Sequence, residues 1–541
     1  MSLMRSVFSF GSMTLVSRLL GFVRDVVFAR WFGAGPAMDA FVFAFKIPNF
    51  LRRLFAEGSF SLAFVPVLNE YREKHDHAAL KSLIDATTGS LLAVLLVVTG
   101  LGVLGASWVV RLFAPGFVDD PHTFVLATDM LRITFPYLLL VALTALSGGI
   151  LNTLGRFALP AVTPALLNVA LITAAVAFSP LFEEPVKALA WGVLAGGVLQ
   201  LAVQVPALAR HNVLPLPRPG FAHDGVRRIM KLMVPTLFGS SVAQISLLFD
   251  VFFASLLASG SLTWLYYGDR LMEFPLGMFG VALSVVILPT LSSLHARNGR
   301  AEYRATLDWA VSWGLLIAVP AAVGLAMLAE PLVITLFRHG AFSSHDAGMA
   351  AVALLAYSIG LPAFTGVKVL APAYFSRQDT KTPVKAAVIA LCVNMVLNVI
   401  FVIAIALWLA GGRFADGFFA GLAAHPGAHA GLALASSASG WLNATLLWRG
   451  LRRQKLAPRL PWARVAQVAA ASLAMAAVLY WLTPDIARWT EQGSLWRIGQ
   501  TGLLISAGAL VYAAVLLALG LRPQSLVRPH VPHQAGETPP E

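Results

Sequence analysis

The stretch RLLGFVRDVVFAR, residues 18–30, is apolar at most positions but carries four charged side chains. It lies inside a longer apolar run that can cross a bilayer as an α-helix. The four charged side chains are Arg18, Arg24, Asp25 and Arg30. An ionised group in hydrocarbon is costly, so charges at such positions usually serve a function. The stretch therefore predicts a transmembrane helix that contributes to a polar site.

Composition extends this interpretation to the whole chain. Of the 541 residues, 58% are hydrophobic and 12% are charged, whereas a soluble protein carries about 25% charged residues. Apolar runs of helical length recur from end to end, which predicts an all-α integral membrane protein with about 14 transmembrane helices. The expected spans are residues 6–33, 37–68, 87–113, 122–152, 157–182, 187–209, 224–258, 261–295, 306–331, 346–376, 382–409, 429–451, 462–482 and 496–521. The single cysteine, Cys392, excludes a disulfide framework and a cysteine-based metal site, and we expect no metal centre and no cofactor.

Lysine and arginine are distributed unequally between the two sides of the predicted spans. Most of the 39 Lys and Arg residues fall in the termini and in loops on the N-terminal side, such as residues 209–231 and 449–464. Positive charge marks cytoplasmic loops, so both termini are expected in the cytoplasm. This distribution accounts for the net charge of +13 without a nucleic-acid partner. The polar, Pro-rich segment 522–541 is expected to be a disordered tail.

A weak internal repeat relates the two halves of the chain. FGSMTLVS at residues 10–17 is similar to FGSSVAQIS at residues 238–246, and further short matches follow at a similar offset. Two similar multi-span bundles around a central site are a common transporter plan. The repeat therefore favours a transporter.

Several charges within the spans have an opposite charge one helical turn away. Arg53 and Glu57 are four residues apart, while Arg270 and Glu273 are three apart, as are Asp129 and Arg132. Side chains at these spacings are neighbours on a helix surface and form ion pairs. The pairs can be structural, or they can belong to a functional site.

Three other arginines, Arg18, Arg24 and Arg52, lack an obvious partner on their own helices. Asn49 precedes Arg52 by three residues, so two hydrogen-bonding side chains share one face. Guanidinium groups bind phosphate oxygens bidentately, and arginines clustered in a water-filled cavity require an anion. We therefore expect a phosphate or pyrophosphate carried within the membrane. Pairing with other helices remains the alternative.

The second half of the chain offers a different polar set. Asp250 lies in the middle of an apolar span, while Asn394 and Asn398 share one helix face. One carboxylate with amide carbonyls is suited to coupling by Na⁺ or by a proton. Hydrogen bonding between helices is the alternative role.

Several segments resemble the MurJ (MviN) family of lipid II flippases, which belongs to the multidrug/oligosaccharidyl-lipid/polysaccharide exporter superfamily. The segments are SRLLGFVRD, FGAGPAMDAF, FKIPNFLRRLFAEGSFSLAFVPVL, ITFPYLLL, LNTLGRFALPA, YYGDRLMEFPLG and VKVLAPAYFSRQDTKTPVK. The resemblance runs from the N-terminus to about residue 455 and is looser beyond. It implies an N-terminal six-helix lobe (1–215), a C-terminal six-helix lobe (216–455) and two additional transmembrane helices (456–521) before the tail.

The resemblance also implies a substrate and a site. Family members move lipid II, an undecaprenyl-pyrophosphate-linked disaccharide-pentapeptide, to the outer leaflet of the cytoplasmic membrane for peptidoglycan synthesis, by alternating access. The arginines that would hold the pyrophosphate are Arg18, Arg24, Arg52 and Arg270. Further motif positions tied to function are Asp39, Asn49, Glu57 and Glu273. Some members bind Na⁺ where Asp250 and Asn394 stand, but Asn398 replaces an acidic residue. Membrane lipids would line the spans, and no protein partner follows.

Two other functions remain open from the sequence. Another exporter of the same superfamily, for lipid-linked polysaccharides, drugs or cations, would share the fold. A drug or cation exporter, however, favours acidic residues where the first half of this chain has excess arginine. A membrane enzyme acting on polyprenyl phosphates needs an acidic or histidine cluster at a membrane face, and none stands out. The chain is not expected to be an enzyme. No nucleotide-binding motif is present, so the energy for transport would come from ion gradients, the membrane potential or downstream consumption of the product.

Overall fold

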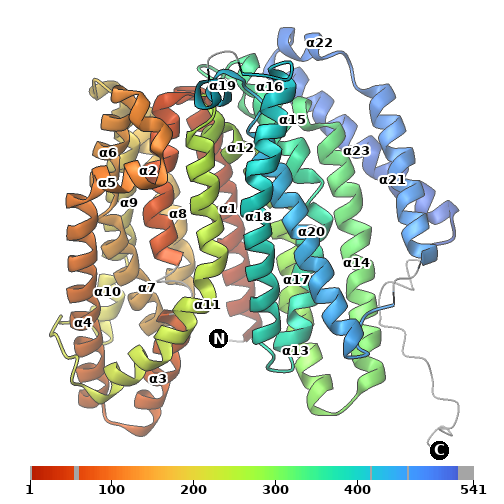
Figure 1. Ribbon diagram of the computed structural model, residues 1–541. Helices are drawn as coiled ribbons and strands as arrows, with labels where there is room; N and C mark the ends of the chain where they lie inside the picture. Colours follow the sequence, from red (N-terminus) through yellow and green to blue (C-terminus); the bar gives the residue numbers. More distant parts are fainter. Residues whose placement is uncertain (1–2, 54–59, 415–416, 460–461, 522–541) are drawn as a thin grey trace, which may run out of the picture. The chain divides into compact units, whose positions relative to one another are not determined.

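The computed structural model describes residues 3–53, 60–414, 417–459 and 462–521, without the side chains of residues 3–15, 61–62, 234–243 and 281–282. Within these ranges the chain is helical and contains no strand (Figure 1). The predicted all-α class is therefore confirmed. A helix suits a bilayer because it satisfies its backbone polar groups internally. The predicted tail and Glu57 lie outside the described residues.

Packing divides the chain into two compact units. The first unit comprises Met1–Thr263 with His339–Ser343, and the second comprises Trp264–Arg338 with Ser344–Glu541. Helices of the first unit are α1 (Leu3–Phe32), α2 (Pro36–Arg52), α3 (Ser61–Lys74), α4 (His77–Leu104), α5 (Ala106–Phe113), η2 (Pro115–Asp119), α6 (Pro121–Thr134), α7 (Tyr137–Thr153), α8 (Ala158–Thr173), η3 (Ala174–Phe178), η4 (Ser179–Leu181), α9 (Lys187–Ala202), α10 (Val205–Arg210) and α11 (Asp224–Ser255). The predicted lobe boundaries at residues 215 and 455 are not tested by this division and stay a prediction.

The second unit holds most of α12 and every later helix. These helices are α12 (Ser261–Pro275), η5 (Leu276–Gly280), α13 (Val281–Ala296), α14 (Arg300–Met327), α15 (Ala329–Phe337), α16 (Ser344–Ser358), α17 (Leu361–Phe375), α18 (Lys381–Leu409), α19 (Phe418–Ala424), α20 (Ala430–Arg453), α21 (Trp462–Leu482), α22 (Ile486–Glu491) and α23 (Ser494–Ala518). Buried side chains of α13, α14, α17, α18 and α20 form one hydrophobic cluster, and those of α14, α21 and α23 form another.

Many of these helices are membrane spans by length and composition. Among the described residues, nine helices are long and apolar enough to cross a membrane, or ten if the pair 344–358 and 361–375, bent by 42°, is one span. Several predicted spans consist of two consecutive helices. Residues 122–152, for example, form α6 and α7 with a break at Pro136, because proline removes a backbone hydrogen bond. The expected count of 14 spans stays a prediction.

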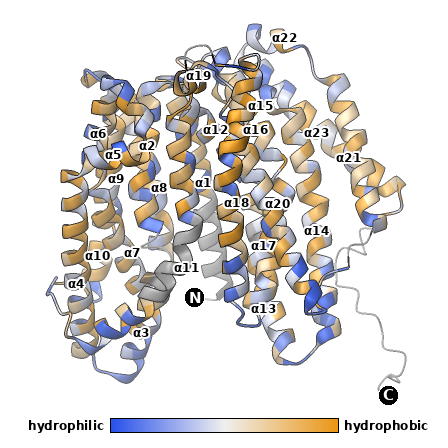
Figure 2. Ribbon diagram, in the orientation of Figure 1, coloured by the Kyte–Doolittle hydropathy of each residue, from blue (hydrophilic) through white to orange (hydrophobic). Residues whose placement is uncertain are grey.

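Helix surfaces carry the apolar side chains that a bilayer requires. Figure 2 shows hydrophobic residues along the middle of α4 and α21 and hydrophilic residues where helices end. On α21, Trp462 is 74% exposed and Trp481 is 85% exposed. These two residues lie about 29 Å apart along the helix axis, close to the hydrocarbon thickness of a bilayer. Tryptophan favours the membrane–water interface, so the pair marks both ends of a membrane span.

The connector that follows α10 is attached along α4 in the first unit. The Asp85 carboxylate accepts a hydrogen bond from the Leu216 N–H at 2.8 Å, and the Asp85 carbonyl accepts one from the Arg218 N–H at 3.2 Å. Ser90 Oγ accepts a third from the Gly220 N–H at 3.1 Å. The extended Pro-rich connector thus satisfies its backbone donors on α4.

Gly89 is required for this close approach of connector and helix. A Cβ at Gly89 would overlap the Arg218 backbone, which cannot move without breaking the hydrogen bonds just described. We expect Gly89→Ala to lower the free energy of unfolding by about 1–3 kcal/mol, measured by thermal melting of the purified protein. Gly100→Ala is the control, because its Cβ meets nothing within 4 Å. Equal melting temperatures for the two variants would contradict the attachment.

Candidate functional site

The Arg24 guanidinium lies at the centre of a buried polar cluster within the apolar part of α1. Arg24 is 6% exposed and Asp25 is 2% exposed. Arg24 Nε and Nη2 both donate to Asp25 Oδ1, at 2.9 and 2.6 Å, and Arg24 Nη1 donates to Asn168 Oδ1 on α8 at 2.9 Å. Asn168 Nδ2 in turn donates to the Ser17 carbonyl at 3.1 Å. The cluster fixes the position of the guanidinium.

The expectation that Arg24 lacks a partner on its own helix is therefore wrong. Adjacent residues on a helix do not normally face each other. The arginine side chain is long enough, however, for its guanidinium Nε and Nη2 to reach the carboxylate of the next residue. Asn168, which belongs to an apolar run, was not among the predicted site residues. An isolated asparagine within a predicted span is the signal that could have found it, because buried amides need partners.

Two other predicted arginines of the first unit are more accessible. Arg18 is exposed, six residues before Arg24 on α1. Arg52 is half-buried at the last residue of α2, and its Nε donates to Asn49 Oδ1 at 3.1 Å. The predicted pairing of Asn49 and Arg52 on one face is therefore confirmed. Arg18 and Arg52 each lie about 21–24 Å along their helices from the short turn that joins α1 and α2.

Asp39 on α2 was predicted to bind the substrate, and in the structure its carboxylate is hydrogen-bonded within the protein. Its buried carboxylate accepts three hydrogen bonds from the start of α12 within the first unit. The donors are the Gly260 N–H at 2.6 Å, the Thr263 N–H at 2.8 Å and the Thr263 hydroxyl at 2.6 Å. A carboxylate at a helix N-terminus satisfies unpaired backbone donors and interacts favourably with the helix dipole. Asp39 thus connects α2 to α12.

A second contact lies near the turn between α1 and α2. The Ala341 N–H donates to the Arg30 carbonyl at 2.9 Å. Gly33 and Gly340 have φ of 65° and 60°, a conformation that favours glycine, and a Cβ at either would overlap the opposite segment. Segment 339–343 is therefore packed closely against the end of α1.

The second unit contains the fourth predicted arginine and its carboxylate. Arg270 Nη1 lies 3.0 Å from Glu273 Oε2 on α12, and its Cζ lies 5.0 Å from the centroid of the Tyr266 ring. The predicted pair of Arg270 and Glu273 is confirmed. In the first unit, the predicted pair of Asp129 and Arg132 is also confirmed at 3.6 Å, and Lys187 Nζ joins the same carboxylate at 3.0 Å.

The predicted cation-site residues are divided between the two units. Asp250 is half-buried on α11 in the first unit. Asn394 and Asn398 are buried on α18 in the second unit, where Asn398 Nδ2 donates to Asn394 Oδ1 at 3.4 Å. Their predicted common face is confirmed. Within the described residues, no group of three or more His, Cys, Asp or Glu side chains could hold a metal ion.

The apolar helices define a multi-pass membrane protein, and the buried arginine and carboxylate groups form a polar site within it. The fold is similar to that of a multidrug resistance MATE family transporter of the MOP superfamily in an inward-facing conformation. The match has a TM-score of 0.64 and covers 83% of this chain and 98% of that chain, at 15% identity. This likeness concerns the fold alone.

The chain belongs to the lipid II flippase MurJ family. The family model "Lipid II flippase MurJ" matches residues 28–498. A probable lipid II flippase MurJ of Vibrio cholerae serotype O1 is 45% identical over 538 residues, which cover 97% of each chain. A solved structure of lipid II flippase MurJ in an inward closed conformation is 28% identical, with a TM-score of 0.75 over 94% of this chain and 97% of that chain. The predicted family is thereby confirmed.

Proposed function

We propose that this chain is a flippase that moves lipid II from the inner to the outer leaflet of the bacterial cytoplasmic membrane by alternating access. The observation that carries the proposal is the buried Arg24 guanidinium, positioned by Asp25 and Asn168 within α1, which the sequence predicts to be a membrane span. End-to-end similarity to proteins named lipid II flippase supports lipid II as the substrate. A drug or cation exporter is less well supported, because it would favour acidic residues where the first half of this chain has excess arginine.

In this proposal Arg24 exchanges one anion for another. A guanidinium has five N–H donors, and Asp25 and Asn168 accept at least three of them. An incoming pyrophosphate would compete with the Asp25 carboxylate for the bidentate face of Arg24. Asp25 thus keeps the buried charge compensated between substrates, which avoids the cost of an isolated ion. Arg18, Arg52 and Arg270 would donate further hydrogen bonds to the pyrophosphate. Asn49 would orient Arg52 and Glu273 would orient Arg270, and the role of Glu57 stays a prediction.

The proposal gives Asp39 a role in opening and closing. Alternating access requires contacts that exist in one state and break in another. In this proposal the three hydrogen bonds from Asp39 to the start of α12 are such a contact. The close packing of segment 339–343 on the end of α1 lies in the same unit. Transport would require both contacts to separate.

The proposed orientation places both termini in the cytoplasm. The supporting observation is the concentration of Lys and Arg in loops on the N-terminal side. A reporter that is active only outside the cytoplasm is expected to be silent when it is fused after Leu521. The same reporter inserted after Arg413, in a predicted outward loop, should be active and is the control. Strong activity after Leu521 would overturn the orientation.

Coupling of transport to a cation is a separate proposal, which rests on Asp250. Asp250→Asn keeps the shape of the side chain and removes its charge. If Na⁺ or a proton is coupled through this carboxylate, transport by the variant in vesicles should lose its dependence on the cation gradient. Thr290→Val, which alters an exposed hydroxyl bonded within its own helix, is the control. Unchanged gradient dependence in Asp250→Asn would leave helix packing as the role of Asp250.

Complementation tests the proposed function directly. A strain depleted of its own lipid II flippase is expected to lyse with lipid II on the inner leaflet, and expression of this chain should restore growth. Restored growth with normal lipid II turnover supports the proposal. If the chain reaches the membrane and growth fails, while a polyprenyl phosphate is converted chemically, the membrane-enzyme alternative gains support instead.

A further inference from the structure

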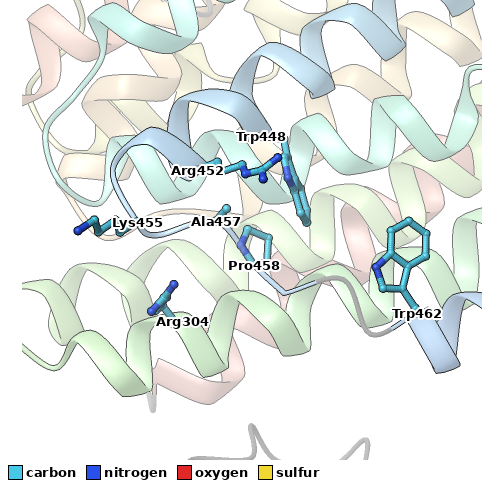
Figure 3. Close-up of a pocket in the computed structure, with 7 residues that line it drawn as sticks. All are labelled: Arg304, Trp448, Arg452, Lys455, Ala457, Pro458 and Trp462. Carbon is cyan, nitrogen blue, oxygen red and sulfur yellow. The ribbon is translucent and has the colours of Figure 1, made fainter.

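A cavity outside the arginine site lies where three helices of the second unit end. It has a volume of about 610 Å³ and lies between α14, the end of α20, residues 455–458 that follow α20, and the start of α21 (Figure 3). Its lining residues are Arg304, Trp448, Arg452, Lys455, Ala457, Pro458 and Trp462. None of these residues belongs to the proposed transport site.

The lining of the cavity is cationic. Arg304, Arg452 and Lys455 contribute three positive charges, and no carboxylate is among the lining residues. An acidic group nearby, Asp308, lies one turn from Arg304 on α14, where its carboxylate accepts a hydrogen bond from the Arg459 N–H at 2.7 Å. Asp308 compensates one cation at most, so the cavity retains an excess of positive charge.

Two tryptophans give the same cavity an apolar side. Figure 3 shows Trp448 and Trp462 flanking Pro458, with the Arg452 side chain directed toward Trp448. Trp462 begins the apolar helix α21, while Arg452 stands in the last turn of α20 and Arg304 in the first turns of α14. Helix ends with tryptophan and arginine lie at the membrane–water interface. A ligand here would meet charge on one side and hydrocarbon on the other.

A smaller cavity lies beside the first one, and Gln454 and Leu456 are among its lining residues. It has a volume of about 240 Å³ and includes His295, Arg300 and Arg377. Arg377 Nη1 donates to Gln454 at 2.5 Å, but Arg377 Nη2 is buried and has no hydrogen-bond partner among the described residues. A buried donor without a partner is costly, which indicates that an anion or water completes this region.

We propose that the larger cavity binds the phosphate of an anionic phospholipid from the surrounding membrane. Arginine and lysine supply donors to the phosphodiester, and basic pockets between membrane helices on the cytoplasmic side suit such headgroups. The tryptophans would contact the glycerol region, and the acyl chains would extend along the exposed apolar surface of α21, where Leu473 is 71% exposed. The ligand is a resident membrane lipid rather than a soluble phosphate, because only a lipid uses the apolar side.

Binding of defined lipids to the purified full-length protein tests this assignment. The probe is short-chain phosphatidylglycerol, added to protein in uncharged detergent and followed by native mass spectrometry and by the rise in melting temperature. R452Q/K455Q removes two charges from the cavity. R449Q/R453Q is the matched control, because it removes two charges from the adjacent last turns of α20 without changing the lining.

We expect R452Q/K455Q to weaken phosphatidylglycerol binding by about tenfold or more, whereas R449Q/R453Q binds as the unmodified protein does. Phosphatidylcholine should bind more weakly than phosphatidylglycerol, and inorganic phosphate should give no rise in melting temperature. Equal loss in both double variants would overturn the site, since it would show a diffuse charge effect. Inorganic phosphate acting as well as the lipid would overturn the lipid assignment. Complementation by either variant is scored separately, so failure of this proposal leaves the transport function untouched.

Discussion

Arg24→Ala is expected to abolish growth in the complementation assay. The substitution removes the guanidinium that would bind pyrophosphate and leaves the Asp25 carboxylate buried without its compensating charge. Breaking a buried ion pair in this way costs about 3–5 kcal/mol. Arg24→Lys keeps one charge but loses the fork that meets a carboxylate or phosphate bidentately, so partial growth is expected. Membrane levels of each variant must be measured beside growth.

The double variant R24A/D25N separates substrate binding from internal charge compensation. It removes both buried charges, because the amide that replaces the Asp25 carboxylate is neutral. If Arg24 serves only to compensate Asp25, the double variant should restore growth. If Arg24 binds the substrate pyrophosphate, the double variant should be made at normal levels and remain inactive, which is our expectation.

Arg413→Ala is the control for these variants. Arg413 is an exposed residue of a predicted outward loop, so its loss should leave growth unchanged. The same comparison applies to Arg52→Ala, where Asn49 loses its partner. If the Arg24→Ala and Arg52→Ala proteins are made at normal levels and support normal growth, these arginines are not the substrate site.

Asp39→Ala is expected to have the second largest effect, loss of growth with a lower melting temperature. It removes three hydrogen bonds from the carboxylate, each worth about 1.5–3 kcal/mol, and leaves backbone donors at the start of α12 unsatisfied. Asp39→Asn should be milder, because its Oδ1 can still accept from the Thr263 N–H and hydroxyl, whereas its amide nitrogen cannot accept from the Gly260 N–H. The melting temperature of purified protein and growth of the depleted strain report the two effects.

Asp76→Ala is the matched control for Asp39. Asp76 caps α4 through the Ala79 N–H at 2.8 Å, but it is exposed, and this cap lies within one helix. Loss of such a cap costs about 0.5–2 kcal/mol, so the variant should melt slightly earlier and support growth. If Asp39→Ala behaves like Asp76→Ala, the connection between α2 and α12 has no role in transport.

Helical spans were the most predictable part of this protein. A membrane requires long apolar helices, and each such helix is visible in the sequence as one continuous apolar segment. Residues 382–409, for example, form α18 (Lys381–Leu409) in the structure. Pairs at helical spacing were also predictable, as Arg270 with Glu273 shows. Both inferences depend only on the geometry of a single helix, which a sequence defines by residue spacing.

Contacts between helices were not predictable in the same way. The sequence by itself determined that apolar helices build the chain, that charges occur within the apolar spans of α1 and α2, and which family the chain resembles. Only the tertiary structure decided that Arg24 donates a hydrogen bond to Asn168, 144 positions later in the chain. Only the tertiary structure, likewise, decided that the Asp39 carboxylate caps the start of α12. The physical reason is that a buried polar group must find a partner somewhere, but its own helix does not specify which other helix supplies it.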